Sequence, residues 1–453
     1  MSLKIKQVSS KLVGPMYNGD DVPKPVLNQF VPLTVFDKLV DDDHSGILYV
    51  YKPPNPSNTL LEQGLRKALV EYREFAGRFS DINGDDERVI LLNDKGLRFV
   101  EATADCTLND IIPFNTTTLS SFNPSHESTG TDELLALVQL TRFTCGSLVL
   151  FFSSNHMVAD GAAASQFLVA WSQACRGLEI HQRPLQYNRN IFVPRDPPSV
   201  SYDHKNVEVA KRVINHELMN DQLPPYSEDD VVLHRAHLTQ DFITKLKSKA
   251  NADMVTGEHR APRPYSTFEC LVAHIWRTMA KVRGLTELDQ TTEMKISVNG
   301  RRRLKPCVPD EYFGNLILAA FPQCGAKELL DESLSHAAEV IHKSIAKVDS
   351  DYFKSFIDFA TNSMQDEDLT LDGEWWKVPT LWPNLEVDSW LGFPFNAVDF
   401  GFGKPYVFMP SFGGWEGVVY LVPSFDGDGS IDVFITLFQQ HLDMFQELCF
   451  CID

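Results

Sequence analysis

The chain lacks the features that mark membrane, secreted and nucleic-acid-binding proteins. No stretch reaches the roughly 18 apolar residues that a membrane-spanning helix needs, and residues 1–15 hold no apolar core of a secretory signal. Positive charge is also scarce, since 41 Lys and Arg stand against 61 Asp and Glu and leave a formal net charge of -20 at pH 7. This balance disfavours nucleic acid and anionic membranes as partners. We expect a cytoplasmic protein that engages neither.

Paired cysteines are also absent. The eight cysteines are scattered, and none has the Cys-x-x-Cys spacing of zinc and redox sites. No group of potential metal ligands has a suitable spacing, so neither a metal nor a cofactor is predicted. Several cysteines lie inside apolar runs, as reduced core cysteines do. This usage fits a cytosolic compartment.

Length and composition predict two domains. The chain has 453 residues, of which 43% are hydrophobic and 23% charged, and it is too long for one ordinary core. Strand and helix patterns alternate without strict regularity, so the expected fold class is α/β with mixed sheets. A proline-rich stretch at the start of residues 181–222 predicts a crossover linker between residues 1–180 and residues 223–453.

One histidine motif stands at a boundary between a strand and a helix. Residues 134–156 read as two apolar strands, and residues 161–177 read as a helix. His156 therefore falls at the end of a buried strand, where α/β proteins place ligands, and Asp160 follows four residues later. On context alone, a catalytic base and a packed structural histidine both remain open.

The same spacing occurs a second time and has a simpler explanation. His237 and Asp241 are also four residues apart, where a helix capped by Thr239 is expected to begin. A carboxylate in the first helical turn is favoured by the helix dipole. The spacing by itself is therefore weak evidence for catalysis.

A distant stretch changes the interpretation of His156. "HMVADG" at residues 156–161 and "DFGFGKP" at residues 399–405, in this order, resemble the two signature motifs of the plant BAHD acyl-CoA-dependent acyltransferases. "YFGN" at residues 312–315, "YSTFECLVAHIWR" at residues 265–277 and "SVNGRRRL" at residues 297–304 are also similar to that family. The resemblance covers essentially the whole chain.

The resemblance implies a fold and a reaction. It implies two chloramphenicol-acetyltransferase-like domains, each a mixed sheet with flanking helices, with an active-site channel between them. It also implies that a segment near residues 365–390 returns to the N-terminal domain. Acyl-CoA would be a substrate rather than a cofactor, and the protein would be a monomer.

The resemblance also assigns roles to residues of the two motifs. His156 would be the general base, taking a proton from the acceptor as it attacks the thioester, with no covalent acyl-enzyme. Asp160 would turn away and pair with Arg301, or with Arg303 as second choice. The residues expected to support the catalytic turn are Asp160, Gly161, Arg301, Asp399, Gly401 and Gly403.

The family places CoA near the start of the helix expected over residues 266–284. Ser266 and Thr267 would donate to a phosphate at the positive end of this helix, with Arg263 nearby. A plain pair of helix-capping hydroxyls explains the same residues.

Two departures from the family pattern bear on the acceptor. Phe402 replaces the usual tryptophan, so another group must stabilise the oxyanion, and Phe402 is expected to contact the acceptor. Gly392 stands where shikimate- and quinate-acylating members have an arginine, which disfavours a carboxylate acceptor. Glu386 and Asp388 alternate on a strand, share one face and suit a cationic acceptor. A solvated strand face explains the same pair.

"LEVDSWLGFPF" at residues 385–395 resembles the amine-acylating branch, which uses agmatine, tryptamine, tyramine or putrescine. The predicted reaction transfers an aromatic acyl group, hydroxycinnamoyl or benzoyl, to a primary amine and gives a phenolamide of plant specialised metabolism. An O-acyltransferase acting on an alcohol is the alternative. Two further alternatives are a non-catalytic binder and a peptide-synthetase condensation domain. Such a condensation domain usually has a histidine where this chain has Asn155.

Overall fold

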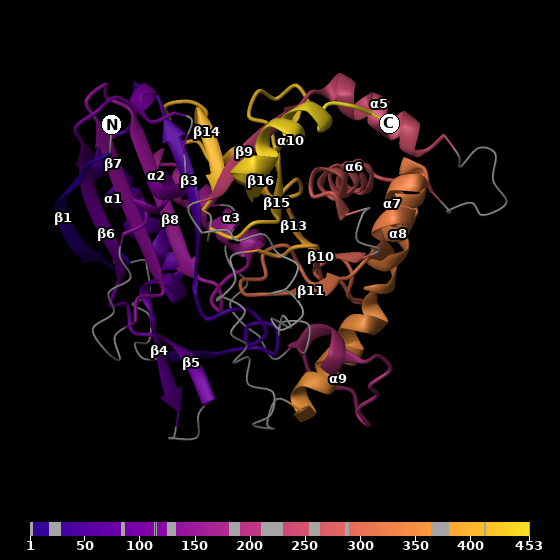
Figure 1. The fold of residues 1–453 in the computed structure, drawn as a ribbon. Coiled ribbons are helices and arrows are strands. Elements are labelled where there is room, and N and C mark those ends of the chain that lie inside the picture. Colours follow the sequence, from indigo (N-terminus) through magenta and orange to yellow (C-terminus); the bar gives the residue numbers. More distant parts are fainter. Residues whose placement is uncertain are drawn as a thin grey trace. The chain divides into compact units, whose positions relative to one another are not determined.

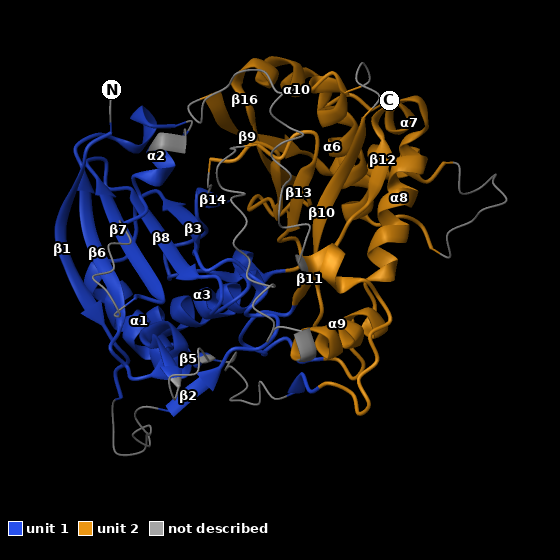
Figure 2. Ribbon diagram, turned by 60° about the horizontal axis from the view of Figure 1, so that its bottom comes forward, with its two compact units in different colours: residues 1–193, 308–316, 393–412 blue, residues 194–307, 317–392, 413–453 orange. Residues whose placement is uncertain are grey.

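The protein forms two compact units, each built from separated parts of the chain. The structure is a computed structural model and describes residues 3–17, 29–82, 87–112, 114, 116–124, 133–180, 191–209, 230–252, 263–285, 290–363, 380–411 and 414–452. Unit 1 comprises residues 1–193, 308–316 and 393–412, and unit 2 comprises residues 194–307, 317–392 and 413–453 (Figure 2). Their relative placement is not determined, so each is described by itself.

Unit 1 is organised around a six-stranded mixed sheet. In spatial order its strands are β1 (Ile5–Val13), β6 (Leu97–Ala104), β7 (Ala136–Phe143), β8 (Leu148–Asn155), β3 (His44–Tyr51) and β14 (Val407–Pro410). Strands β6 and β7 pair in parallel, whereas the other neighbours pair antiparallel. All eight residues of β8 are buried, which explains its apolar sequence.

Helices cover one face of this sheet, and a small sheet completes unit 1. Helix α1 (Asn58–Glu71) packs beside α3 (Gly161–Cys175) over the strands (Figure 1). The remaining elements are η1 (Arg73–Ala76), η2 (Leu108–Asp110), α2 (Thr116–Ser120), η11 (Pro394–Ala397) and a sheet of β2 (Gln29–Pro32), β5 (Glu87–Leu92) and β4 (Arg78–Ile82). Because nearly all of α3 is buried, its alanines serve close packing.

Unit 2 contains a second mixed sheet. Its strands in spatial order are β11 (Ile317–Ala320), β10 (Thr291–Asn299), β13 (Leu385–Ser389), β15 (Val418–Pro423), β16 (Ile431–Phe438) and β9 (Val231–Leu238), and β12 (Gln323–Gly325) also pairs with β10. Strand β13 pairs in parallel with both β10 and β15. The other pairings in this sheet are antiparallel.

The central helix of unit 2 is α6. The helices and helical turns are η4 (Lys205–Val209), α5 (Gln240–Ala250), α6 (Thr267–Val282), α7 (Ala326–Asp331), α8 (Leu334–Lys347), α9 (Ser350–Ser363), η12 (Gln439–His441) and α10 (Leu442–Leu448). Helix α6 packs against α5, α8 and α10. It is buried over most of its length, which accounts for its many apolar residues.

The expected α/β class with two mixed sheets and flanking helices is confirmed. Residues 393–412 return to unit 1 and supply β14, whereas residues 380–392 belong to unit 2. The predicted returning segment near 365–390 lies largely outside the described residues, as does much of the predicted linker over 181–222. The predicted domain boundaries therefore stay predictions.

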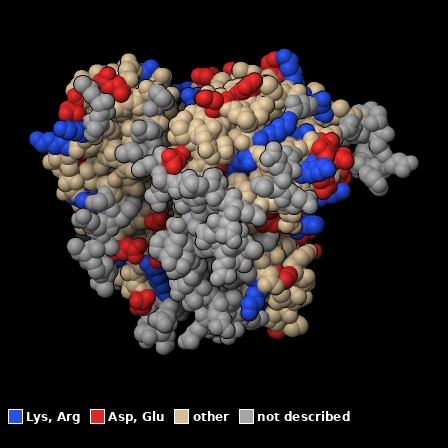
Figure 3. Space-filling model, in the orientation of Figure 1, with Lys and Arg blue, Asp and Glu red and all other residues tan. Residues whose placement is uncertain are grey.

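Figure 3 shows acidic and basic side chains interspersed on one face of the described molecule. None of the described helices is both long enough and apolar enough to span a membrane.

Candidate active site

The structure places His156 directly after β8, in a turn that leads to α3. Its backbone N–H donates to the carbonyl of Asp43 over 2.8 Å. The ring Nδ1 is buried and has no hydrogen-bond partner among the described residues, although the residue as a whole is only partly buried. A catalytic role for this ring would therefore fall to Nε2.

Asn155 shapes this turn from inside the protein. Its amide Nδ2 donates to Asp42 over 2.7 Å, and its Oδ1 accepts from the backbone N–H of Met157 over 2.9 Å. The side chain is fully buried. The asparagine thus holds the loop in which the histidine lies.

A segment far along the chain also holds the histidine. Asn315 Nδ2 donates to the backbone carbonyl of His156 over 2.8 Å and to Asp37 Oδ1 over 2.9 Å. Asp37 Oδ1 accepts in addition from the backbone N–H of Asn315, and its Oδ2 accepts from the Thr34 hydroxyl. Asp37 and Asn315 are both fully buried. Neither residue had a role predicted from the sequence, although Asn315 ends the "YFGN" stretch.

Asp160 acts on backbone groups. Its Oδ1 accepts from the N–H of Ala163 over 2.9 Å and caps α3, and its Oδ2 accepts from the N–H of Leu316 over 3.2 Å. The side chain is 1% exposed. The carboxylate thereby fixes where α3 begins, immediately after the histidine turn.

The predicted partner of Asp160 lies in the other unit. Arg301 follows β10 and is 1% exposed, and its backbone N–H donates to Asn299 Oδ1 over 3.0 Å. Arg303 donates to the carbonyls of Ile345 and Val348 over 3.3 and 3.4 Å. Because the two units are described separately, the pairing of Asp160 with Arg301 stays a prediction.

The "DFGFG" segment belongs to unit 1 and docks at the far end of α3. Asp399 Oδ2 lies 3.4 Å from Nη1 of Arg176, the residue that ends α3, and Asp399 Oδ1 accepts from the N–H of Gly401 over 2.7 Å. Gly401 and Gly403 have φ of 94° and 97°, which favour glycine. A helix of 15 residues spans about 22 Å, so this segment lies well away from the start of α3.

Phenylalanines 400 and 402 of this segment have different environments. Phe400 is 2% exposed and packs edge-on against Trp171 with ring centroids 5.3 Å apart. Phe402 is 43% exposed. Its predicted contact with the acceptor stays a prediction, and its position near the end of α3 adds no support to it.

The predicted CoA-binding residues are engaged within unit 2. Ser266 caps α6 and forms a capping box with Glu269, with Thr267 as the first helical residue. Arg263 binds both oxygens of Glu269 over 3.0 Å each. His342 Nδ1 lies 2.8 Å from the same carboxylate. A phosphate at this helix end would have to compete with Glu269 for Arg263.

Glu386 and Asp388 project from the same face of β13. Leu385 and Val387, which alternate with them along the strand, are buried, as strand geometry requires. Glu386 pairs with Lys295 of the neighbouring strand over 2.6 Å. Asp388 lies opposite Tyr420 in the parallel ladder.

Aromatic rings border these carboxylates. The rings of Trp390 and Tyr420 meet edge-on with centroids 5.2 Å apart. Burial raises the pKa of the Tyr420 phenol well above its usual value, and the carboxylates of Asp388 and Glu386 raise it further. This strand face therefore combines negative charge with aromatic surface, a combination that suits organic cations.

The second histidine–aspartate spacing has the structural explanation expected from the sequence. Asp241 lies in the first turn of α5 and pairs with Lys245, and Thr239 caps this helix. His237 lies in β9 and its Nδ1 is 2.8 Å from Asp432.

A third constellation was not foreseen because it begins in the predicted linker. His204 Nε2 lies 2.9 Å from the hydroxyl of Ser355, and its Nδ1 lies 3.0 Å from Glu208. These distances match a serine–histidine–acid triad. However, all three side chains are buried, and the Ser355 hydroxyl also accepts from the N–H of Ser201 over 2.9 Å. These hydrogen bonds hold the segment that contains Ser201 and His204 against α9, and a substrate cannot reach the buried serine.

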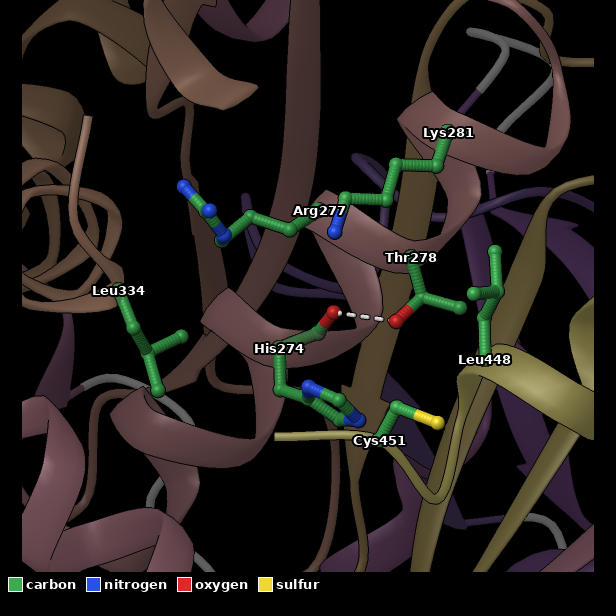
Figure 4. Close-up of a pocket in the computed structure, with 7 residues that line it drawn as sticks. All are labelled: His274, Arg277, Thr278, Lys281, Leu334, Leu448 and Cys451. Atoms are coloured by element: carbon green, nitrogen blue, oxygen red, sulfur yellow. Dashed lines mark hydrogen bonds between the residues drawn. The ribbon is translucent and has the colours of Figure 1, made fainter. Parts of the chain in front are cut away.

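Unit 2 contains a pocket beside α6, lined by His274, Arg277, Thr278, Lys281, Leu334, Leu448 and Cys451 (Figure 4). The Thr278 hydroxyl donates to the carbonyl of His274 over 2.9 Å, and the His274 ring contacts the carbonyl of Cys449 over 2.8 Å. Arg277 donates to the carbonyls of Leu329 and Glu332. The arginine is thus committed to the end of α7.

Comparison with known proteins identifies the family. The sequence model of the Transferase family matches residues 22–449 of the chain. The chain belongs to this family, the BAHD acyltransferases, and is an acyl-CoA-dependent acyltransferase.

Particular relatives are similar over the whole chain. The chain is 43% identical to agmatine hydroxycinnamoyltransferase 1 of Oryza sativa subsp. japonica, with 99% of each sequence covered. It is 42% identical to putrescine hydroxycinnamoyltransferase 3 of the same plant, with 100% of each covered. The crystal structure of vinorine synthase matches with a TM-score of 0.69 at 21% identity, covering 97% of this chain and 96% of that chain, which shows the fold.

Proposed function

We propose that the protein transfers a hydroxycinnamoyl group from its CoA thioester to the primary amine of a small aliphatic cation, such as agmatine or putrescine. Two relatives with full-length similarity at 43% and 42% identity carry these acceptors in their names. The chain also has Gly392 in place of an arginine that would bind a carboxylate acceptor.

The observation that carries the acceptor class is the acidic and aromatic face of β13. Glu386 and Asp388 lie on one side of the strand, with Tyr420 and Trp390 beside them. A guanidinium or ammonium at the distal end of the acceptor gains charge attraction from the carboxylates and ring contacts from the aromatic residues. Glu386 pairs with Lys295, and we assign binding of the distal cation to Glu386 and Asp388 together.

The proposed chemistry uses His156 as a general base. The amine nitrogen attacks the thioester carbonyl, and Nε2 of His156 takes a proton from that nitrogen as the N–C bond forms. The C–S bond then breaks, and the proton passes from the imidazolium to the leaving thiolate of CoA. The amide and free CoA are the products, and no covalent acyl-enzyme forms.

The residues around the histidine are proposed to position it. Asp160 fixes the start of α3, and Asn315 and Asp43 hold the carbonyl and N–H of His156. Base catalysis of this kind contributes about 10² to 10⁴ in rate and requires the base within hydrogen-bond reach of the proton.

The test is an acceptor panel with the purified full chain and p-coumaroyl-CoA, using CoA release as readout. The panel contains agmatine, putrescine, tryptamine, shikimate and an aliphatic alcohol. We expect the highest kcat/KM for agmatine or putrescine. A higher kcat/KM for the alcohol or for shikimate would overturn the proposal, and a preference for tryptamine would overturn the assignment to an aliphatic cation.

A further inference from the structure

A group of three potential metal ligands lies in unit 2, separate from the face of β13 and from the start of α6. Cys324 lies in β12, Glu328 lies in the first turn of α7, and His336 lies near the start of α8. One ligand atom from each side chain lies within 4.8 Å of the other two. The spacing Cys-x3-Glu-x7-His belongs to no familiar sequence pattern, so the sequence analysis did not find it.

The three ligand atoms lie near one another but are not yet at the spacing of ligands around one bound ion. His336 Nε2 lies 3.0 Å from Glu328 Oε1, yet this buried nitrogen has no hydrogen bond of acceptable geometry among the described residues. Atoms bound to one tetrahedral zinc at 2.0 to 2.3 Å lie roughly 3.3 to 3.6 Å from one another. Movements of about an ångström would bring the three atoms into this arrangement.

We propose that Cys324, Glu328 and His336 form a binding site for a zinc-type divalent ion, with thiolate, carboxylate and imidazole ligands. A thiolate and an imidazole select zinc over magnesium and calcium, which prefer oxygen ligands. With three protein ligands, the fourth position of the ion is left to water.

Access and local anchoring support this assignment. The side chains of His336 and Glu328 are 30% and 56% exposed, so an ion can enter from solvent, whereas Cys324 is buried. Thr292 of β10 lies opposite Cys324 in the antiparallel ladder, and the Ser333 side chain caps α8 just before His336. A bound ion would therefore link β12, α7 and α8.

Ion binding requires a proton to leave the cysteine. The thiolate, not the thiol, is the form of cysteine that binds a metal ion. The S–H bond is replaced by a sulfur–metal bond and the proton goes to solvent. Binding of the ion should therefore tighten as the pH rises.

The test uses the full chain after treatment with a chelator. Zinc titration by calorimetry should show one site, and Co²⁺ should give the absorption of a cobalt–thiolate bond. We expect Cys324→Ser to abolish that absorption and His336→Gln to weaken zinc binding by about 100-fold. Cys451→Ser is the matched control, because this exposed cysteine of the same unit lies outside the group.

Three results would overturn the proposal: no stoichiometric binding of zinc, a cobalt spectrum that persists in Cys324→Ser, or binding of magnesium as tight as that of zinc. Glu328→Gln covers the case in which the cysteine variant fails to fold, because this side chain is largely exposed, and unchanged zinc affinity in it would also count against the site. Acyl transfer without zinc should continue, which separates this test from that of the proposed function.

Discussion

The amide of Asn315 donates to the carbonyl of His156 over 2.8 Å, although 159 positions separate the two residues in sequence. Asp37 in turn accepts from the amide and the backbone N–H of Asn315, over 2.9 Å each. All three residues belong to unit 1. The backbone of the proposed base is thus held by buried groups that take no part in the chemistry.

Replacing Asn315 should therefore impair turnover more than binding. In Asn315→Ala the carbonyl of His156 loses its donor and Asp37 keeps a charge with fewer partners, so the ring shifts relative to the substrate. A displacement of about 1 Å can cost about 10² in rate. We expect kcat to fall by about this factor with a small change in KM, measured by steady-state kinetics.

Thr107→Ala is the control for general destabilisation of unit 1. Thr107 forms a capping box with Asp110 in η2, which contributes to stability apart from the histidine turn. This variant should lower the thermal midpoint without lowering kcat. Equal kinetic losses in both variants would refute a positioning role for Asn315.

Removal of the imidazole itself should abolish most of the activity. His156→Ala is expected to lower kcat by about 10² to 10⁴, the range of general-base catalysis. The buried Nδ1 of its ring has no hydrogen-bond partner among the described residues that the variant would lose, so the thermal midpoint should stay close to that of the wild type. Unchanged turnover would revive the reading of a non-catalytic binder.

The carboxylates of β13 should matter for cationic acceptors only. A hydrogen bond to a charged group contributes about 1.5 to 3 kcal/mol, so Asp388→Asn should raise KM for agmatine by about 10- to 100-fold. Glu386→Gln should also raise KM for agmatine, because it removes the other carboxylate of this strand face. KM for the CoA thioester should not change in either variant.

The control for these variants is Glu447→Gln, an exposed acid on α10. It tests whether loss of any negative charge weakens a cationic acceptor through long-range attraction. If Glu447→Gln raises KM for agmatine as much as Asp388→Asn does, the strand face is not the acceptor site.

An amine acceptor should make the reaction depend on pH through the substrate. An alkyl ammonium has a pKa near 10, and only its neutral form is a nucleophile. The fraction of neutral amine rises about tenfold per pH unit below that value. We expect kcat/KM for putrescine to rise between pH 7 and pH 9, and a flat profile over this range would contradict an amine nucleophile.

Acid stability should depend on Glu269. Burial alone would raise the pKa of this carboxyl, but hydrogen bonds from Arg263, Ser266 and His342 outweigh it and lower the pKa to about 2. Because the folded-state pKa is depressed, the ionised group stabilises the fold above about pH 4.5, and this contribution disappears as the pH falls towards 2.

Glu269→Gln should therefore lower the free energy of unfolding at pH 7. The difference in this free energy between variant and wild type should disappear between pH 4.5 and pH 2. Urea unfolding at several pH values measures this, with Asp443→Asn as an exposed control. A gap that stays constant with pH would show that packing, rather than charge, is lost in the glutamine variant.

Local patterns in the sequence predicted the elements around the site well. The apolar run before His156 is β8, and the alanine-rich stretch after it is α3, as strand and helix patterns indicate. Thr239 caps α5 as expected, because a hydroxyl before a helical pattern meets the free N–H groups of the first turn.

Long-range partners could not be predicted in the same way. Nothing local in "YFGN" says that Asn315 reaches the carbonyl of His156, since such a bond depends on how distant segments pack. The buried His204–Glu208–Ser355 group was missed for the same reason. The proline-rich composition predicted a linker there, whereas Ser201 and His204 are hydrogen-bonded to Ser355 of α9.

That buried group has a practical consequence for searches by geometry. A search that compares only interatomic distances would report a hydrolase centre at Ser355, His204 and Glu208. What a nucleophile needs in addition is a path for water or ester and donors that face a developing negative charge. Here the serine oxygen faces a backbone N–H of its own chain. In this protein, solvent access distinguishes a catalytic triad from a structural hydrogen-bond group, whereas the distances alone do not.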